Sequence, residues 1–389
     1  MHDTRDDQMT TPPRADEPRK RLAGTYRART ADETWEIIAP QLYEYGITRV
    51  ADVTDLDIFG VPVAMAARPL SQTLSVSQGK GVTMQLARVS AAMEAIEFWH
   101  AEEACPTLLA RNVSAEHLEL PYDVTLLDCE AGSLLTSSYP LDWVAAVGLQ
   151  TAEVKPVPLR AVSLADDRRT VWQPPGLRAS TNGLASGNTR AEAVVHALYE
   201  LIERDIVASV PAGRHRHVRP ETLGGQCAEL ADRFLRAGAY LEIRSLPNQW
   251  DVFCFAVRLW SEDFPVMAVG YGAHAEAAIA LSRALSESAQ SRLTAISGSR
   301  DDITAIYRQA RSSSVRRPDP VPPGIDWAEV HAASGTEFPD FATEQAWLSA
   351  SVTRVTGHEP LTVDLSTSDD FSVVKVLALG AGFDGKRGE

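Results

Sequence analysis

Two long apolar segments of this sequence carry the same arrangement of acidic residues. SAAMEAIE at 90–97 and HALYELIE at 196–203 align without gaps, and each follows a glycine-rich stretch. Apolar residues lie on every side of both segments, which predicts two long helices, 84–103 and 190–210, that are buried over most of their surface. Such helices need a large core around them, and 389 residues, 44% of them hydrophobic, can build one.

Each predicted helix places two carboxylates on one face. Glu94 and Glu97 lie three residues apart, as do Glu200 and Glu203, so the members of each pair are neighbours on the helix surface. Two buried carboxylates repel each other and lose hydration unless a cation lies between them. Mg²⁺ prefers oxygen ligands and is commonly held by carboxylates together with phosphate oxygens. One such pair is usually a solvated helix face, whereas two matching pairs favour a metal site.

The glycine-rich stretches SQGKG and NGLASGN add a second signal. Glycines let backbone N–H groups approach an anion without obstruction by side chains. The first stretch lacks the GxxxxGK[ST] spacing of a P-loop and the second lacks GxGxxG, so neither standard nucleotide motif is present. Lys80, inside SQGKG, is either a phosphate ligand or a solvent-facing lysine, and His196 is either a core residue or a nucleotide contact.

Strand and helix patterns alternate along the rest of the chain. Thr30 and Glu33 form a capping box before a helical pattern, and strand patterns follow in 239–272. A third long helix begins at His274, and FSVVKVLALG is predicted to be a last strand. This alternation predicts an α/β or α+β architecture. Residues 1–22 are charged and contain proline, which predicts a disordered arm before one domain that spans 23–389.

Charge and cysteine content exclude several classes of protein. The net charge of −15 is unfavourable for binding nucleic acid or an anionic membrane. Cysteines are few and far apart, without a CxxC pair, so no zinc site or disulfide framework is indicated. No apolar run is long enough to span a membrane, and the first 20 residues lack the apolar core of a signal peptide. We therefore expect a cytoplasmic protein.

The two glutamate segments and their surroundings resemble a known family. SVSQGKGVTMQLARVSAAMEAIEFWHAE and STNGLASGNTRAEAVVHALYELIERD resemble the two signature blocks of the YcaO family. GITRVADVTDLDIFGVPVAMAARP before them and SESAQSRLTAISGSRDD after them resemble its flanking segments in the same order. The resemblance covers about residues 25–305, with the signature core at about 60–305, and 306–389 is less distinctive.

This resemblance implies long helices packed on mixed sheets and an ATP site without a P-loop. It also implies ATP- and Mg²⁺-dependent activation of a peptide backbone amide, in which the amide oxygen is phosphorylated and a nucleophile then replaces it. A Cys, Ser or Thr side chain as nucleophile gives an azoline, external sulfide gives a thioamide, and a backbone amine gives an amidine. The substrate would be a ribosomally made precursor peptide or a protein.

The family's site residues can be carried over position by position. The glutamates match the magnesium ligands and, with a phosphate-facing arginine, make up the catalytic set: Glu94, Glu97, Glu200, Glu203 and Arg204. Further positions match nucleotide contacts: Ser90, Asn188 and Arg292. Arg27 and Thr34 have the spacing of a lysine and a serine that contact the nucleotide in the family, and Lys80 remains a further candidate.

Two departures from the family pattern bear on the product. Many azoline-forming members end in a proline-rich tail that supplies a base, whereas this sequence has no proline after Pro360. GITRVADVT and VPVAMAARP resemble members that work with a TfuA-type partner, which is associated with thioamide formation. We therefore expect a thioamide and a TfuA-like or leader-docking partner protein, with a homodimer as the default assembly.

Two other functions stay open from the sequence. One is cyclodehydration to azolines, and the other is a non-catalytic, nucleotide-binding accessory role in ribosomal protein modification. The intact set of four glutamates disfavours the accessory role. The basic run RHRHVR at 214–219 is either a solvated loop or a contact for an acidic peptide leader.

Overall fold

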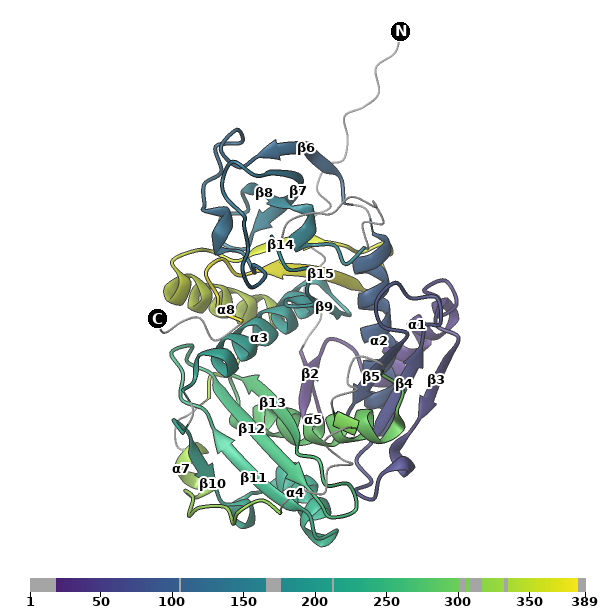
Figure 1. Ribbon diagram of the computed structural model, residues 1–389. Coiled ribbons are helices and arrows are strands. Elements are labelled where there is room, and N and C mark those ends of the chain that lie inside the picture. Colours follow the sequence, from purple (N-terminus) through teal and green to yellow (C-terminus); the bar gives the residue numbers. More distant parts are fainter. Residues whose placement is uncertain are drawn as a thin grey trace.

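The computed structural model describes residues 19–104, 106–165, 176–211, 213–300, 306–307, 317–331 and 335–383. It is a mixed α/β structure in which long helices pack on separate sheets, as the sequence predicted (Figure 1). Within these residues, no helix has both the length and the apolar character needed to cross a bilayer.

The strands form three larger sheets and one hairpin, with antiparallel pairing between adjacent strands. The first sheet has the order β3 (Arg49–Asp52), β4 (Val63–Ala67) and β5 (Val76–Lys80). The second has the order β6 (Leu108–Ser114), β7 (Pro140–Gly148), β14 (Leu361–Asp364), β15 (Ser372–Leu377) and β9 (Leu184–Gly187), with β8 (Val154–Pro158) also paired to β7. The third has the order β10 (Arg216–Val218), β11 (Tyr240–Ser245), β12 (Phe253–Trp260) and β13 (Ala268–His274), and the hairpin joins β1 (Lys20–Leu22) to β2 (Thr25–Arg27).

Each larger sheet carries one long helix. The helices α2 (Met84–Glu103), α3 (Arg190–Ser209) and α5 (Ala277–Ser297) pack on β5, β9 and β13 respectively. The first two match the predicted bounds closely, whereas α5 begins three residues after His274 because β13 continues to that residue. The shorter helices are α1 (Ala31–Ile38), α4 (Gly225–Arg236), α7 (Trp327–His331) and α8 (Phe341–Thr356).

The glycine-rich stretches are strands rather than open loops. A Cβ at Gly79 in β5 would lie 2.0 Å from the backbone nitrogen of Ala91 in α2. A Cβ at Gly187 in β9 would lie 2.5 Å from the nitrogen of Ala193 in α3. Gly79 and Gly187 let a helix lie directly on a strand, where any side chain would collide with backbone. That N–H groups of these stretches approach an anion stays a prediction.

The predicted disordered arm ends earlier than residue 22. Residues 1–18 lie outside the described residues, but Lys20–Leu22 forms a strand of the N-terminal hairpin. Arg19 forms an ion pair with the buried Glu344 of α8 at 3.2 Å, and its guanidinium lies 3.6 Å from the ring centre of Tyr26. This buried charge pair holds the chain against α8 before the hairpin begins. The capping box of Thr30 and Glu33 is present at the start of α1, as predicted.

Candidate active site

Three edge strands meet at a cavity of about 1070 Å³. β5, β9 and β13 each lie at one end of their sheet, so the outer side of each strand has no neighbouring strand. Residues of these strands, of the hairpin strand β2 and of the helices α2, α3 and α5 line the cavity. The cavity therefore lies where the three sheets and their long helices come together (Figure 1).

The structure brings all four predicted glutamates to this cavity. The edge strands hold three of them through backbone N–H groups. Gln78 N donates to Glu94 at 2.6 Å, Ser186 N donates to Glu97 at 2.8 Å, and Ala273 N donates to Glu203 at 2.9 Å. One oxygen of each carboxylate is thus fixed in place, which leaves the second oxygen for a cation.

Burial and mutual repulsion make the ionised cluster unfavourable without a cation. Burial raises the pKa of Glu94 to about 7, and burial together with the charges of Glu94 and Glu200 raises that of Glu97 to about 8. Burial, with the charge of Glu287, raises the pKa of Glu203 to about 7. The pKa of Glu200 is also raised by burial, although Arg204 lies 2.6 Å from it. This set of carboxylate oxygens fits a hard divalent cation such as Mg²⁺.

Cationic side chains surround the glutamates. Arg204 lies at the cavity, pairs with Glu200 and donates to Asn182 Oδ1 at 2.5 Å. Lys80 also lines the cavity and pairs with Glu287 across it, from β5 to α5. Both side chains are partly exposed, so they can reach an anion that enters the cavity.

With the exception of Arg292, the other predicted nucleotide contacts lie in the same cavity. Thr34 Oγ1 donates to Asn188 Oδ1 at 2.8 Å, and Asn188 Nδ2 donates to Glu192 at 3.2 Å. Arg27 lies in contact with His196, and its Nε is 3.7 Å from Glu192. Ser90 lines the cavity one turn before Glu94. The α1 helix, the hairpin and the start of α3 thus supply a polar cluster beside the glutamates.

Arg292 does not belong to this site. It is fully buried, and its guanidinium forms ion pairs with Asp57 at 3.1 Å and Asp263 at 2.8 Å. It does not line the cavity, whereas Arg283 of the same helix does. The expectation of a phosphate contact at Arg292 is therefore corrected, because both of its ion pairs hold it on the other side of α5.

Sequence reasoning missed two acidic residues that the structure places at the cavity. Glu192 is buried at the start of α3 and accepts hydrogen bonds from Ala28 N and Asn188. Glu287 accepts from Tyr271 N at 3.3 Å, and this pair is separated by 16 residues, as are Gln78 and Glu94. The sequence signal for Glu287 was the glycine-containing segment GYGAH before a third long helix, because it repeats the strand-to-helix arrangement of the first two segments.

Lys375 was also missed. This lysine is 2% exposed in β15, donates to Ser180 O at 2.5 Å, and has its pKa lowered to about 8 by burial, against the opposing charge of Glu200. The sequence signal for a functional role of Lys375 was its position as the single lysine inside the apolar run FSVVKVLALG.

Comparison with known proteins gives consistent results. A family model described as YcaO cyclodehydratase, binding ATP and Mg²⁺, matches residues 78–381. An uncharacterised protein of Mycobacterium tuberculosis is 40% identical over 377 residues, covering 92% of this chain and 82% of the relative. A protein of Rhizobium leguminosarum bv. trifolii, described as lying in the tfuA 3′ region, is 36% identical over 310 residues, covering 74% of this chain and 72% of the relative.

A solved structure shows the same fold. It is a YcaO protein of Methanopyrus kandleri bound with AMPPCP and Mg²⁺. The TM-score is 0.74 at 24% sequence identity, and the match covers 95% of this chain and 96% of that one. The matched region thus includes most of 306–389, which the sequence left less distinctive, and the four glutamates lie inside the family match.

Proposed function

Because the chain belongs to the YcaO family, we propose that it uses ATP and Mg²⁺ to activate a backbone amide of a ribosomally made peptide or of a protein. The family is ATP- and Mg²⁺-binding and its activity is of the cyclodehydratase type. One observation carries the proposal for this chain: four glutamates from two helices face one cavity, and strand amides fix one oxygen on three of them.

Each part of the site has a role in this reaction. Glu94, Glu97, Glu200 and Glu203 would hold Mg²⁺, which neutralises charge between the carboxylates and the phosphates when it is bound. Arg204 and Lys80 would add positive charge towards the phosphates. The polar cluster of Arg27, Thr34, Ser90 and Asn188 would bind the rest of the nucleotide.

The proposed reaction balances as follows. The terminal phosphoryl group of ATP is transferred to the amide oxygen, which leaves ADP. A nucleophile forms a bond to the amide carbon, and the carbon–oxygen bond then breaks with phosphate as the leaving group. The original amide oxygen leaves in that phosphate. The side chains of the cavity position the amide and stabilise charge on the phosphates, while the nucleophile comes from the substrate or from a donor.

We infer further that the nucleophile is external sulfide and that the product is a thioamide. The position of the Rhizobium relative beside tfuA supports this reading, as does the resemblance of 46–54 and 61–69 to members with a TfuA-type partner. A TfuA-like or leader-docking protein would then bring the substrate. The tail without proline includes residues 384–389, which lie outside the described residues. Azoline formation is the second candidate, favoured by the cyclodehydratase description of the family.

Mass spectrometry of a precursor peptide tests both levels of the proposal. The protein, a candidate precursor, its partner and Mg·ATP are incubated with and without sulfide, and ADP is measured in the same samples. Exchange of one oxygen for sulfur is expected, and only when sulfide is present. Loss of one water from the peptide would contradict thioamide formation but would agree with activation of the amide. ATP turnover without any change in peptide mass, for every candidate precursor and partner, would contradict amide activation itself.

A further inference from the structure

Helices cover one face of the sheet β10–β13, and the other face packs against α3 at β13 and reaches the cavity at Tyr271. α4 and α5 pack on the first face (Figure 1). On the second face, strand pairing places four residues directly opposite one another across all four strands: His217, Arg244, Ala256 and Tyr271. Directly paired residues project from the same face of a sheet. Because Tyr271 lines the cavity, this row of side chains runs from the cavity wall to β10.

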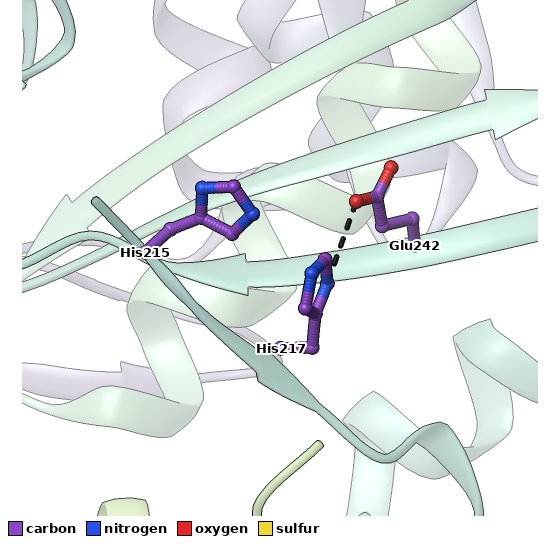
Figure 2. Close-up of side chains that lie close together, drawn as sticks. All are labelled: His215, His217 and Glu242. Atoms are coloured by element: carbon purple, nitrogen blue, oxygen red, sulfur yellow. Dashed lines mark ion pairs between the residues drawn. The ribbon is translucent and has the colours of Figure 1, made fainter. Parts of the chain in front are cut away.

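Cationic and histidine side chains gather along this row. His215 precedes His217 by two residues, and Figure 2 shows both rings beside Glu242 of β11. Glu242 is buried and accepts hydrogen bonds from Arg244 Nε and from Arg258, each at 2.7 Å. One carboxylate thus holds two guanidinium groups in place. Both arginines keep unused N–H donors, with 28% and 32% of their side chains exposed.

The local charge favours an anion over a metal ion. His215, His217 and Glu242 each offer a ligand atom within 4.8 Å of the others, which is compatible with a metal site. However, both oxygens of Glu242 already accept from arginine, and two guanidinium groups against one carboxylate leave a positive excess. Burial, and then the positive charge of Arg244, lowers the pKa of His215. A divalent cation would meet the same repulsion, whereas a carboxylate would be attracted.

We propose that this basic sheet face, formed by His215, His217, Arg244 and Arg258, binds an acidic segment of the substrate peptide. The inference rests on the proposed function, since that function brings a peptide to the cavity. Carboxylates of the peptide accept charge-assisted hydrogen bonds from the unused guanidinium N–H groups. The basic face lies on a chain whose net charge is −15, so it is a local exception that can select an acidic ligand.

The strand spacing sets where the acidic residues lie in the peptide. Neighbouring strands are about 4.8 Å apart, so Arg244, two strands from Tyr271, is about 10 Å from the cavity wall. His217, on the next strand, is about 14 Å from it by the same spacing. An extended peptide rises about 3.4 Å per residue. The acidic residues therefore lie roughly three or four positions from the peptide residue that passes Tyr271, and farther than that from an amide inside the cavity.

Fluorescence anisotropy with the full-length protein tests this inference. The probe is a short fluorescein-labelled peptide of alternating glutamate and serine, and its matched control has glutamine in place of glutamate. We expect the glutamate peptide to bind at low salt, and the glutamine peptide to bind at least about tenfold more weakly. Arg244→Gln and Arg258→Gln should each weaken binding of the glutamate peptide by about tenfold. Glu242 keeps one arginine partner in either variant, so the fold should be retained.

A matched control comes from the opposite side of the sheet. Arg236 on α4 is 80% exposed and is also ion-paired, with Asp232 at 3.1 Å, so Arg236→Gln should leave peptide binding unchanged. Equal binding of the two peptides would overturn the inference without any variant. The inference would also be overturned if Arg244→Gln and Arg258→Gln bound the glutamate peptide like the wild type. The same holds for a zinc titration in which His217→Ala loses one zinc site of the wild type while peptide binding is unchanged.

Binding of Mg·ATP, measured in the same samples, separates this inference from the proposed function. Wild-type protein that binds Mg·ATP but does not distinguish the peptides contradicts the inference alone. Protein that selects the glutamate peptide but does not bind Mg·ATP contradicts the proposed function alone. The Arg244 and Arg258 variants should bind Mg·ATP as the wild type does, because neither residue lines the cavity.

Discussion

Glu97 and Glu200 come from different helices, and loss of charge at either should disable the site. Glutamine keeps nearly the same size and keeps an oxygen that can accept the hydrogen bonds of Ser186 at Glu97. We expect Glu97→Gln and Glu200→Gln each to lower ATP turnover by about 100-fold or more, because charge neutralisation at the phosphates is lost. The free energy of unfolding without ligand should hold or rise, since repulsion within the cluster is relieved.

Steady-state turnover and denaturant melts measure the two effects. Glu36→Gln, on the exposed side of α1, is the matched control and should change neither. A lower ligand-free stability combined with unchanged turnover would show that these two glutamates are structural.

Asn188 offers a test of nucleotide binding. Its side chain connects Thr34 and Glu192 at the cavity, so it can orient this polar cluster towards a nucleotide. Asn188→Ala should raise the KM for ATP by about tenfold, since one or two hydrogen bonds contribute about 1–3 kcal/mol. The melting temperature should change little. A KM that stays the same would remove this residue from the binding site.

Motif matching predicted most of the residues that line the cavity, but it did not predict the direction in which every side chain points. The four glutamates, Asn188 and Arg204 were predicted because apolar surroundings or motif position set them apart. Arg292 was misplaced because its partners, Asp57 and Asp263, come from distant segments that no local pattern connects to α5. A motif fixes a position on the helix, whereas the packing of remote segments decides the direction of the side chain.

Between elements, α2 lies so near β5 that no side chain fits at Gly79. A Cβ at Gly79 would lie 2.0 Å from Ala91 N and 2.1 Å from Ala87 O, and both atoms belong to the helix backbone. Gly79→Ala must therefore move α2 away from the strand. We expect a loss of stability of about 1–3 kcal/mol or more, together with weaker binding of Mg·ATP, because Glu94 and Glu97 move with the helix.

Gly224→Ala is the control for this substitution. Gly224 has φ near −124°, and a Cβ added there would meet no atom within 4 Å, so alanine fits. Gly224 is the N-cap residue of α4, where alanine is less favourable than glycine, so the stability of this variant should fall by no more than about 1 kcal/mol and its binding of Mg·ATP should not change. Equal melting temperatures for the two variants would show that α2 can shift without penalty, contrary to this account.

Helix positions were predicted well, and strand positions around the glycines were not. Thr83 and Thr189 cap α2 and α3 through their side chains, so local sequence alone fixes where these helices begin. The stretches SQGKG and NGLASGN have the composition of turns. The strand β5 nevertheless pairs with the nearby β4, and β9 pairs with β15, which is far away in the sequence. Sheet order likewise depends on long-range pairing, which composition does not encode.

The cluster of acidic residues makes the stability of the whole protein depend on pH. The pKa values of Glu94 and Glu203 are about 7, and that of Glu97 is about 8, against 4.5 in an unfolded chain. The folded protein therefore binds more protons than the unfolded chain in this range, and stability falls as pH rises. We expect the ligand-free melting temperature to be lower at pH 8 than at pH 6.5.

Thermal melts at these two pH values, with and without Mg·ATP, measure this dependence. Mg·ATP should stabilise the protein more at pH 8, because the cation then meets ionised carboxylates without displacing protons. Lowered pKa values at Glu33 and Glu359, both about 2, do not interfere, since these groups are ionised in both states above pH 6. Burial lowers the pKa values of His196 and His274, which opposes the trend, but the three glutamates titrate across the whole range and outweigh these two groups. Glu97→Gln should flatten the dependence, and an unchanged slope in that variant would contradict this assignment.

The three edge strands around the cavity have a consequence for solubility. An unpaired strand edge invites another chain to add to it, and many proteins protect such edges with charged side chains. Here one backbone N–H group of each of β5, β9 and β13 donates to a glutamate from inside the molecule. The glutamates that we propose as Mg²⁺ ligands would thus also protect the sheets against self-association. Replacement of Glu94, Glu97 and Glu203 by alanine, unlike replacement by glutamine, would leave these N–H groups of the three edge strands without an acceptor. Such a variant would be more prone to aggregate.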